Sequence, residues 1–203
     1  MIDQVRLQHY QPAFLRCISK QASMRLLVFL FCTLPFLAKA QTELYGMHSR
    51  WSDSFGEWYL ASPVERQAGT LERQYPMGDD WTQWRVRWDG YTGTIRQKWV
   101  NRSDQWEVRY ANEIVTMRMV YPGDINSWRI VGGNTTLTWE RPYRNLDAKW
   151  VIRGDSYGNY TIYTEYEGDP RDWIIVDEAS KEVTTAMKLA MAFLSVFYST
   201  PKV

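Results

Sequence analysis

The feature of this 203-residue sequence that most constrains its fold is a tryptophan repeat. A Trp followed two positions later by Val or Ile recurs at spacings of 22, 22, 22 and 23 residues. The copies begin at Trp84, Trp106, Trp128, Trp150 and Trp173. A second short segment that opens with Thr and an apolar residue follows most copies, and turn residues such as Gly, Asp and Asn separate the segments. A repeat of this length indicates a recurring supersecondary unit, here two short strands.

Within the repeat, apolar and polar residues alternate with the period of a β-strand. Trp84, Val86 and Trp88 share one phase, whereas Arg85 and Arg87 share the other. A strand with this pattern buries one face of its sheet and exposes the other. The repeat therefore predicts a mainly β fold, an antiparallel meander of about 11–12 strands. Because a flat sheet of that size would have long unpaired edges, we expect it to curl or close into a barrel.

The sequence after the last repeat predicts a helix over residues 178–199. This segment contains neither Gly nor Pro, and between residues 186 and 198 only two side chains are polar. Asp177 or Ser180 is expected to cap the helix. A helix that is apolar on nearly every side must be buried on nearly every side. We therefore expect the helix to pass through the middle of the barrel.

The first forty residues are predicted to be a leader rather than part of the fold. Residues 24–40 combine a basic start, an apolar run at 26–37 and the small-x-small motif Ala38-Lys-Ala40, which is typical of a signal peptide. We divide the chain into a leader or non-native extension at 1–23, a signal peptide at 24–40 and a single barrel domain at 41–203. The apolar run is too short for a membrane span, and we expect none in the mature chain. Both cysteines lie in the leader, and an exported, cysteine-free protein suits the bacterial envelope, periplasmic or extracellular.

Three features of the sequence together resemble one known family. They are the Trp-x-(Val/Ile) strands, the segment Thr94-Ile-Arg-Gln-Lys-Trp99, and the segment Asp172-Trp-Ile-Ile-Val-Asp177 that leads into the apolar helix. They resemble the tubby-like C-terminal superfamily, which includes the tubby domain, the phospholipid scramblases and the LURP-one-related proteins. The likeness extends from Trp58 to Val203. It implies a closed set of strands around a hydrophobic C-terminal helix, and, because some members bind membrane lipids, it also implies a lipid ligand, with no binding position carried over.

Basic residues on the outward phase of the strands are the first candidates for a binding surface. They are Arg85, Arg87, Arg96, Lys98, Arg109, Arg118, Arg129 and Arg153. Together they predict a cationic face for an anionic lipid or polysaccharide. From this set we select as ligand-binding candidates Arg85, Arg87, Arg96, Arg109 and Arg118. Acidic neighbours such as Glu107, Glu140 and Glu165 would instead make ordinary cross-strand pairs with them.

Aromatic residues are the second set of candidates. The repeat tryptophans fall on the apolar phase of their strands and are expected in the core. Trp51 and Trp81 lie outside that phase, so we expect them to be exposed and able to stack on a ligand such as a sugar.

Composition and motifs argue against several other functions. With 24 Lys+Arg against 23 Asp+Glu, the chain lacks the basic excess of a dedicated nucleic-acid binder. It has no Gly-x-Ser-x-Gly motif, phosphate loop or multi-cysteine site, and we expect no catalytic residue, cofactor or metal. Asp169, Asp172 and Asp177 could hold Ca²⁺, but a turn followed by a helix cap explains them better. His48 has no partner that the sequence identifies and is expected on the surface near a flexible N-terminus.

The sequence therefore predicts an exported, non-catalytic binding or structural protein of the bacterial envelope, with a lipid or other anionic surface as its ligand. The alternative is a carbohydrate or cell-wall binding module that uses exposed Trp and Tyr. A hydrolase with an unrecognised carboxylate pair is a less favoured alternative. An outer-membrane barrel is disfavoured because its arginines would face lipid.

Overall fold

The computed structural model describes residues 42–100, 102–143 and 148–202. These residues form twelve β-strands and one α-helix. The strands are β1 (Gly46–Ser49), β2 (Glu57–Ala61), β3 (Gly69–Arg73), β4 (Gln83–Trp88), β5 (Tyr91–Trp99), β6 (Arg102–Tyr110), β7 (Glu113–Met119), β8 (Ser127–Gly132), β9 (Thr135–Glu140), β10 (Trp150–Ile152), β11 (Gly158–Tyr166) and β12 (Asp169–Ala179). The helix is α2 (Thr185–Ser199). The extension predicted at 1–23 and the signal peptide predicted at 24–40 lie outside the described residues.

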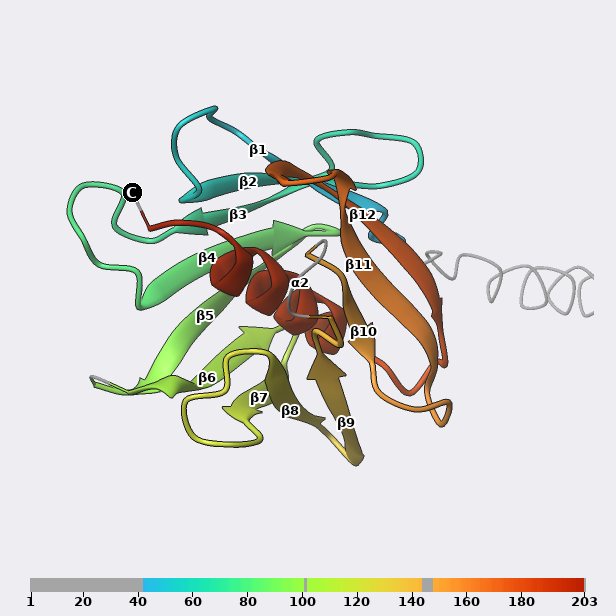
Figure 1. Ribbon diagram of the computed structural model, residues 1–203. Coiled ribbons are helices and arrows are strands. Elements are labelled where there is room, and N and C mark those ends of the chain that lie inside the picture. The colour runs from blue at the N-terminus through green and yellow to red at the C-terminus, as the bar shows by residue number, and fades with distance from the viewer. Residues whose placement is uncertain (1–41, 101, 144–147, 203) are drawn as a thin grey trace, which may run out of the picture. The chain divides into compact units, whose positions relative to one another are not determined.

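The strands form a closed antiparallel barrel in which each strand pairs with its neighbours in sequence (Figure 1). Closure occurs between β1 and β12, where Met47 lies opposite Trp173 and His48 lies opposite Asp172. The other side of β1 pairs with β2. Closure thus gives the first and last strands the partners that a flat sheet would lack. The predicted meander, its number of strands and its closure are confirmed.

The repeat tryptophans line the interior near one end of the barrel. Because the chain is a meander, all even-numbered strands begin at the same end, which we call the tryptophan end. Each of these strands carries a fully buried Trp on its inner face: Trp58 on β2, followed by the five repeat tryptophans Trp84, Trp106, Trp128, Trp150 and Trp173. In five of the six, the indole Nε1 donates to the backbone carbonyl three residues earlier, at 2.8–3.1 Å. These tryptophans therefore supply much of the core of the barrel and, in five of the six even-numbered strands, a hydrogen bond to the backbone at or just before the start of the strand.

Helix α2 lies inside the barrel, as its apolar sequence predicts (Figure 1). The ring of Phe193 packs edge-on against Trp84 and Trp106, with centroid distances of 5.6 and 4.8 Å. Near the C-terminal end of the helix, Trp150 Nε1 donates to Ser199 Oγ at 3.0 Å. The helix is thus packed on the repeat tryptophans and hydrogen-bonded to two of them, Trp150 and Trp106.

The predicted start of the helix is wrong. Strand β12 continues to Ala179, and α2 begins only at Thr185. Thr184 is the N-cap, and its Oγ1 accepts a backbone N–H of the first helical turn. Asp177, expected to cap the helix, lies in β12 and accepts from Lys188 Nζ at 2.6 Å. The reason is that the β-branched residues before Asp177 favour a strand, and pairing with β11 extends that strand through positions whose own propensity is helical.

Candidate functional site

The predicted arginines lie on the outer face of the barrel, on four neighbouring strands. Arg85 and Arg87 on β4 both contact one carboxylate oxygen of Glu72 on β3, at 3.5 and 3.1 Å. One acid is therefore shared by two cations, and the trio keeps a net positive charge. Acidic side chains thus pair with these arginines, as the alternative interpretation expects, but they neutralise only part of the positive charge.

A second trio repeats this arrangement on the next two strands. Glu107 on β6 contacts Arg96 on β5 at 3.2 Å and Arg109 on its own strand at 2.7 Å. The hydrogen bond from Arg109, followed by the one from Arg96, holds the pKa of the Glu107 carboxyl below its usual range, against the opposing effect of burial. Glu107 therefore remains ionised, and this trio also keeps one net positive charge.

Arg118 forms the third cationic position, together with a neighbour. It lies on β7 directly opposite Arg129 on β8, and both side chains are exposed. Within the described residues, neither arginine shares an acid in the way that the arginines of the two trios do. The charge of Arg118 adds only a little to the effect of the hydrogen bond from Arg102, which lowers the pKa of the Asp104 carboxyl. Like charges that face each other across a sheet are destabilising. An anion bound between these two side chains would relieve that repulsion.

The two tryptophans predicted to be exposed differ from each other. Trp51 is exposed, and the guanidinium of Arg50 lies 5.1 Å from its ring centroid. Trp81 is partly buried against the core, with its ring 5.9 Å from that of Trp84 and the guanidinium of Arg73 at 4.3 Å. The expectation of an exposed Trp81 is corrected: its carbonyl accepts from Trp84 Nε1, which holds this residue against the barrel wall.

Exposed apolar side chains gather at the tryptophan end. In the described part of the chain, nine of the thirteen exposed large hydrophobic residues lie on or beside the six connections from odd- to even-numbered strands. We call these nine residues the rim: Trp51, Tyr75, Met77, Trp99, Val100, Tyr121, Ile125, Tyr143 and Tyr166. Every one of the six connections contributes at least one of them. The rim therefore encircles one end of the barrel, and the periodicity of the strands could not reveal it.

Positive charge adjoins one part of the rim. Arg118 lies one residue before the end of β7 and Arg129 two residues after the start of β8, so both lie near the tryptophan end. The connection between these strands carries Tyr121 and Ile125, and the neighbouring β5–β6 connection carries Val100, which is 88% exposed. The β5–β6 and β7–β8 connections thus place exposed apolar side chains beside Arg118 and Arg129, which are not bridged by a common acidic side chain of the described residues.

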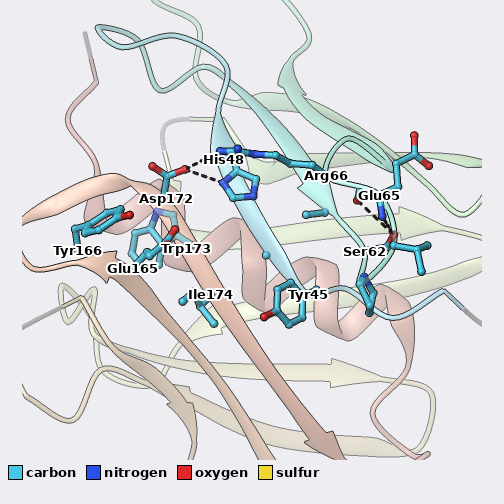
Figure 2. Close-up of a pocket in the computed structure, with 14 residues that line it drawn as sticks. Tyr45, His48, Ser62, Glu65, Arg66, Glu165, Tyr166, Asp172, Trp173 and Ile174 are labelled. Carbon is cyan, nitrogen blue, oxygen red and sulfur yellow. Dashed lines mark hydrogen bonds and ion pairs between the residues drawn. The ribbon is translucent and has the colours of Figure 1, made fainter.

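A recess of about 520 Å³ lies on the outer side of the barrel, between β1, β12 and the β2–β3 connection (Figure 2). His48 stands in it, with Nδ1 2.7 Å from Oδ1 of Asp172. Since a carboxylate can only accept, the hydrogen bond assigns the proton of a neutral ring to Nδ1 and leaves Nε2 as an acceptor. Arg66 reaches across His48 to the same carboxylate oxygen, at 3.9 Å. The expectation that His48 lacks a partner is wrong, because its partner lies 124 residues away in sequence.

The recess does not pair His48 with an activated hydroxyl. Ser62 is the serine that lines it, and its Oγ accepts from the backbone N–H of Glu65 at 3.0 Å and donates to the Glu65 carbonyl at 3.3 Å. That side chain closes a turn. The polar groups of the recess are therefore arranged to orient His48 and to form hydrogen bonds with a guest molecule.

The three aspartates considered as calcium ligands point to three separate partners. Asp169 accepts from Arg171 at 2.6–2.8 Å, Asp172 pairs with His48, and Asp177 pairs with Lys188. Among the described residues no three His, Cys, Asp or Glu side chains converge as metal ligands would.

Comparison of the chain with protein-family models, curated proteins and solved structures gives no match. No helix in the described ranges has both the length and the apolar character that a membrane crossing requires.

Proposed function

We propose that this protein is an exported, non-catalytic binding protein that docks the tryptophan end of its barrel onto an anionic lipid surface. The observation that carries the proposal is the rim, which places exposed aromatic or aliphatic side chains on all six connections at one end. Trp and Tyr favour the interface of a bilayer, where an apolar ring and a polar edge are both accommodated. Because the six connections lie at the same end of a closed barrel, they could reach such a surface together.

Aliphatic residues at the connections favour lipid over sugar as the main ligand of the rim. Met77 is 95% exposed and Val100 is 88% exposed, so both are nearly free of contacts within the barrel. A sugar stacks on an aromatic face and gains little from a flexible aliphatic chain. A bilayer removes such a chain from water, which is favourable by about 1.5 kcal/mol for a residue the size of Val.

The arginines beside the rim supply the preference for negative charge. Near an anionic leaflet each Lys or Arg contributes about 1 kcal/mol to binding. Arg118 and Arg129 oppose each other without a shared acid, so a phosphate bound between them would replace repulsion by two charge-assisted hydrogen bonds. The Glu72 and Glu107 trios, each with one net charge, extend the same cationic face around the barrel.

Co-sedimentation with vesicles tests the proposal. The purified protein is mixed with vesicles of phosphatidylglycerol and phosphatidylcholine, or of phosphatidylcholine alone. Val100→Asp should weaken binding to the anionic vesicles by about tenfold. Val64→Asp is the matched control, because Val64 is 95% exposed but lies at the opposite end, on the β2–β3 connection.

A double variant tests the charge. Arg118→Gln with Arg129→Gln should lose about thirtyfold in affinity for the anionic vesicles, from about 1 kcal/mol per arginine. It should also reduce the dependence of binding on salt. If Val100→Asp and Val64→Asp weaken binding equally, or if the wild-type protein ignores both kinds of vesicle, the rim is not a lipid-binding surface.

We also propose a distant relationship to the tubby-like C-terminal superfamily. It is supported by the closed meander of twelve strands and by the apolar C-terminal helix inside it, which is the arrangement that the sequence resemblance implies. An experimental structure that superposes on a tubby-like member strand for strand, with the helix in the same direction, would establish it. A different strand order or helix direction would indicate an independent origin of the barrel.

A further inference from the structure

We infer that the recess beside His48 is a second binding site, separate from the rim function, and that it takes a saccharide rich in hydrogen-bond donors, amino sugars included. Its volume of about 520 Å³ lies within the range of small-molecule sites and far exceeds the space of a single water molecule. The recess extends along β1 and β12 from the β2–β3 connection, which lies at the end opposite the rim, to Tyr166, the one rim residue that lines it. A guest there would therefore contact one of the nine rim residues and leave the other eight free for docking.

The polar groups of the recess favour a ligand that brings many donors. His48 Nε2 is an acceptor, because Nδ1 is engaged by Asp172. The carboxylates of Glu65 and Glu165 are two more acceptors, and no ion pair engages either of them among the described residues. In contrast to these acceptors, Arg66 is a hydrogen-bond donor. A hydroxyl group can both donate and accept, so a polyol could meet all of these groups at once.

The apolar and aromatic parts of the recess fit the same class. Tyr45 and Tyr166 line it and are both more than half exposed, so their ring faces are open to a guest. The negative face of a tyrosine ring attracts the C–H face of a sugar ring and, more strongly, an ammonium group. Ile174 adds an apolar wall. A wholly apolar guest would instead strip water from His48 and Arg66 without replacing their hydrogen bonds.

The charge of the residues that line the recess predicts which class of sugar binds most tightly. Three acidic residues line the recess, Glu65, Glu165 and Asp172, against one guanidinium, while the neutral imidazole of His48 adds no charge. A protonated amino sugar should therefore bind more tightly than a neutral sugar, and a uronic acid should bind least. This order of affinities follows from the acidic residues that line the recess. It distinguishes the recess from the outer face of β4–β8, which is cationic.

The side-chain ¹⁵N signal of His48 reports directly on the site. The purified full-length protein, labelled with ¹⁵N-histidine, is titrated with a glucosamine trisaccharide, with maltotriose and with trigalacturonate, each to about 10 mM, where a ligand of millimolar affinity approaches saturation. The signal is assigned by its loss in His48→Gln. We expect a saturable shift with the first two ligands, at lower concentration for the glucosamine trisaccharide, and no saturable shift with trigalacturonate.

Two exposed positions provide variants that should fold normally. Tyr45→Ala should weaken binding about tenfold, whereas Tyr91→Ala, equally exposed but outside the recess, should not change it. Glu165→Gln should reduce the preference for the glucosamine trisaccharide over maltotriose. Absence of a saturable shift with both of these ligands, trigalacturonate as the tightest ligand, or full binding by Tyr45→Ala would each overturn the inference. Vesicle binding by Tyr45→Ala should equal that of the wild type, so the two proposals can fail independently.

Discussion

Replacing Trp106 by Phe tests whether the tryptophan repeat is a structural device. Trp106 is fully buried on β6, with its indole Nε1 3.1 Å from the Ser103 carbonyl and 3.1 Å from the Tyr198 hydroxyl. Its ring packs against Phe193 and Phe197 of α2, at centroid distances of 4.8 and 4.9 Å. The Phe ring keeps the aromatic contact with the helix but removes the N–H and part of the ring.

The decrease in the free energy of unfolding follows from the loss of the N–H and of part of the ring. Trimming a buried ring without collapse of the site costs about 1–2 kcal/mol. Losing the indole hydrogen bonds costs about 1 kcal/mol. The Ser103 carbonyl is not left without a donor, because the Tyr198 hydroxyl also donates to it at 2.7 Å, so no further desolvation penalty is added. The expected decrease in the free energy of unfolding is therefore about 2–3 kcal/mol.

Urea unfolding followed by far-ultraviolet circular dichroism measures this decrease. Trp99→Phe is the matched control: Trp99 is 54% exposed, its Nε1 donates to Gln105 Oε1 in a solvent-exposed hydrogen bond, and its replacement should change stability by less than about 0.5 kcal/mol. A Trp106→Phe variant as stable as Trp99→Phe would refute the structural role of the repeat. If such a variant also lost binding to a polysaccharide, the repeat tryptophans would be a ligand platform instead.

Three further predictions concern other parts of the barrel. Phe193→Ala should lower the free energy of unfolding by about 3–5 kcal/mol in urea melts, because the side chain is fully enclosed among aromatic rings; a loss below about 1 kcal/mol would show that the helix is loosely held. Lys188→Met should cost about 3 kcal/mol at pH 7, because it leaves the buried carboxylate of Asp177 unpaired, and unchanged thermal stability would contradict this pairing. Glu107→Gln should cost about 1 kcal/mol at pH 7, since its partners are half exposed. The pKa of Glu107 is lowered in the folded state, so its contribution to stability is complete above the unfolded pKa of about 4.3 and disappears as the pH falls through the folded pKa. The free energies of unfolding of wild type and variant should therefore converge in acid. A constant difference between them down to pH 2 would contradict the lowered pKa.

The fold was largely predictable because its determinants are local and repeated. The period-two pattern from Trp84 to Trp88 identifies the buried face of a strand, and the recurrence of the pattern predicts a meander. The apolar sequence of α2 requires enclosure, which only a closed sheet of this size provides. The helix start was missed because pairing with β11 extends β12 to Ala179, and that pairing depends on a neighbouring strand rather than on local propensity.

The candidate sites were less predictable because they depend on closure. The register of β1 against β12 brings His48 to Asp172 across 124 residues, which no local pattern encodes. The rim depends on which connections share an end, and this follows only from the meander. One signal was present in the sequence: large apolar residues such as Val100 and Tyr121 stand next to turns, where polar residues are usual. The arginines of the outer face were predictable from strand phase, but not the sharing of Glu72 and Glu107 between them.

Quenching by brominated lipid tests most directly whether the rim contacts a bilayer. In a Trp51→Phe background, Trp99 is the exposed rim tryptophan of the described residues, and acrylamide should quench it while the buried repeat tryptophans stay protected. Anionic vesicles whose acyl chains carry bromine should quench this same fraction when they bind the protein, and vesicles without bromine should shield it from acrylamide. If the protein sediments with the vesicles but its acrylamide-accessible fraction is neither quenched nor shielded, the protein binds lipid through another face and the account of the rim is wrong.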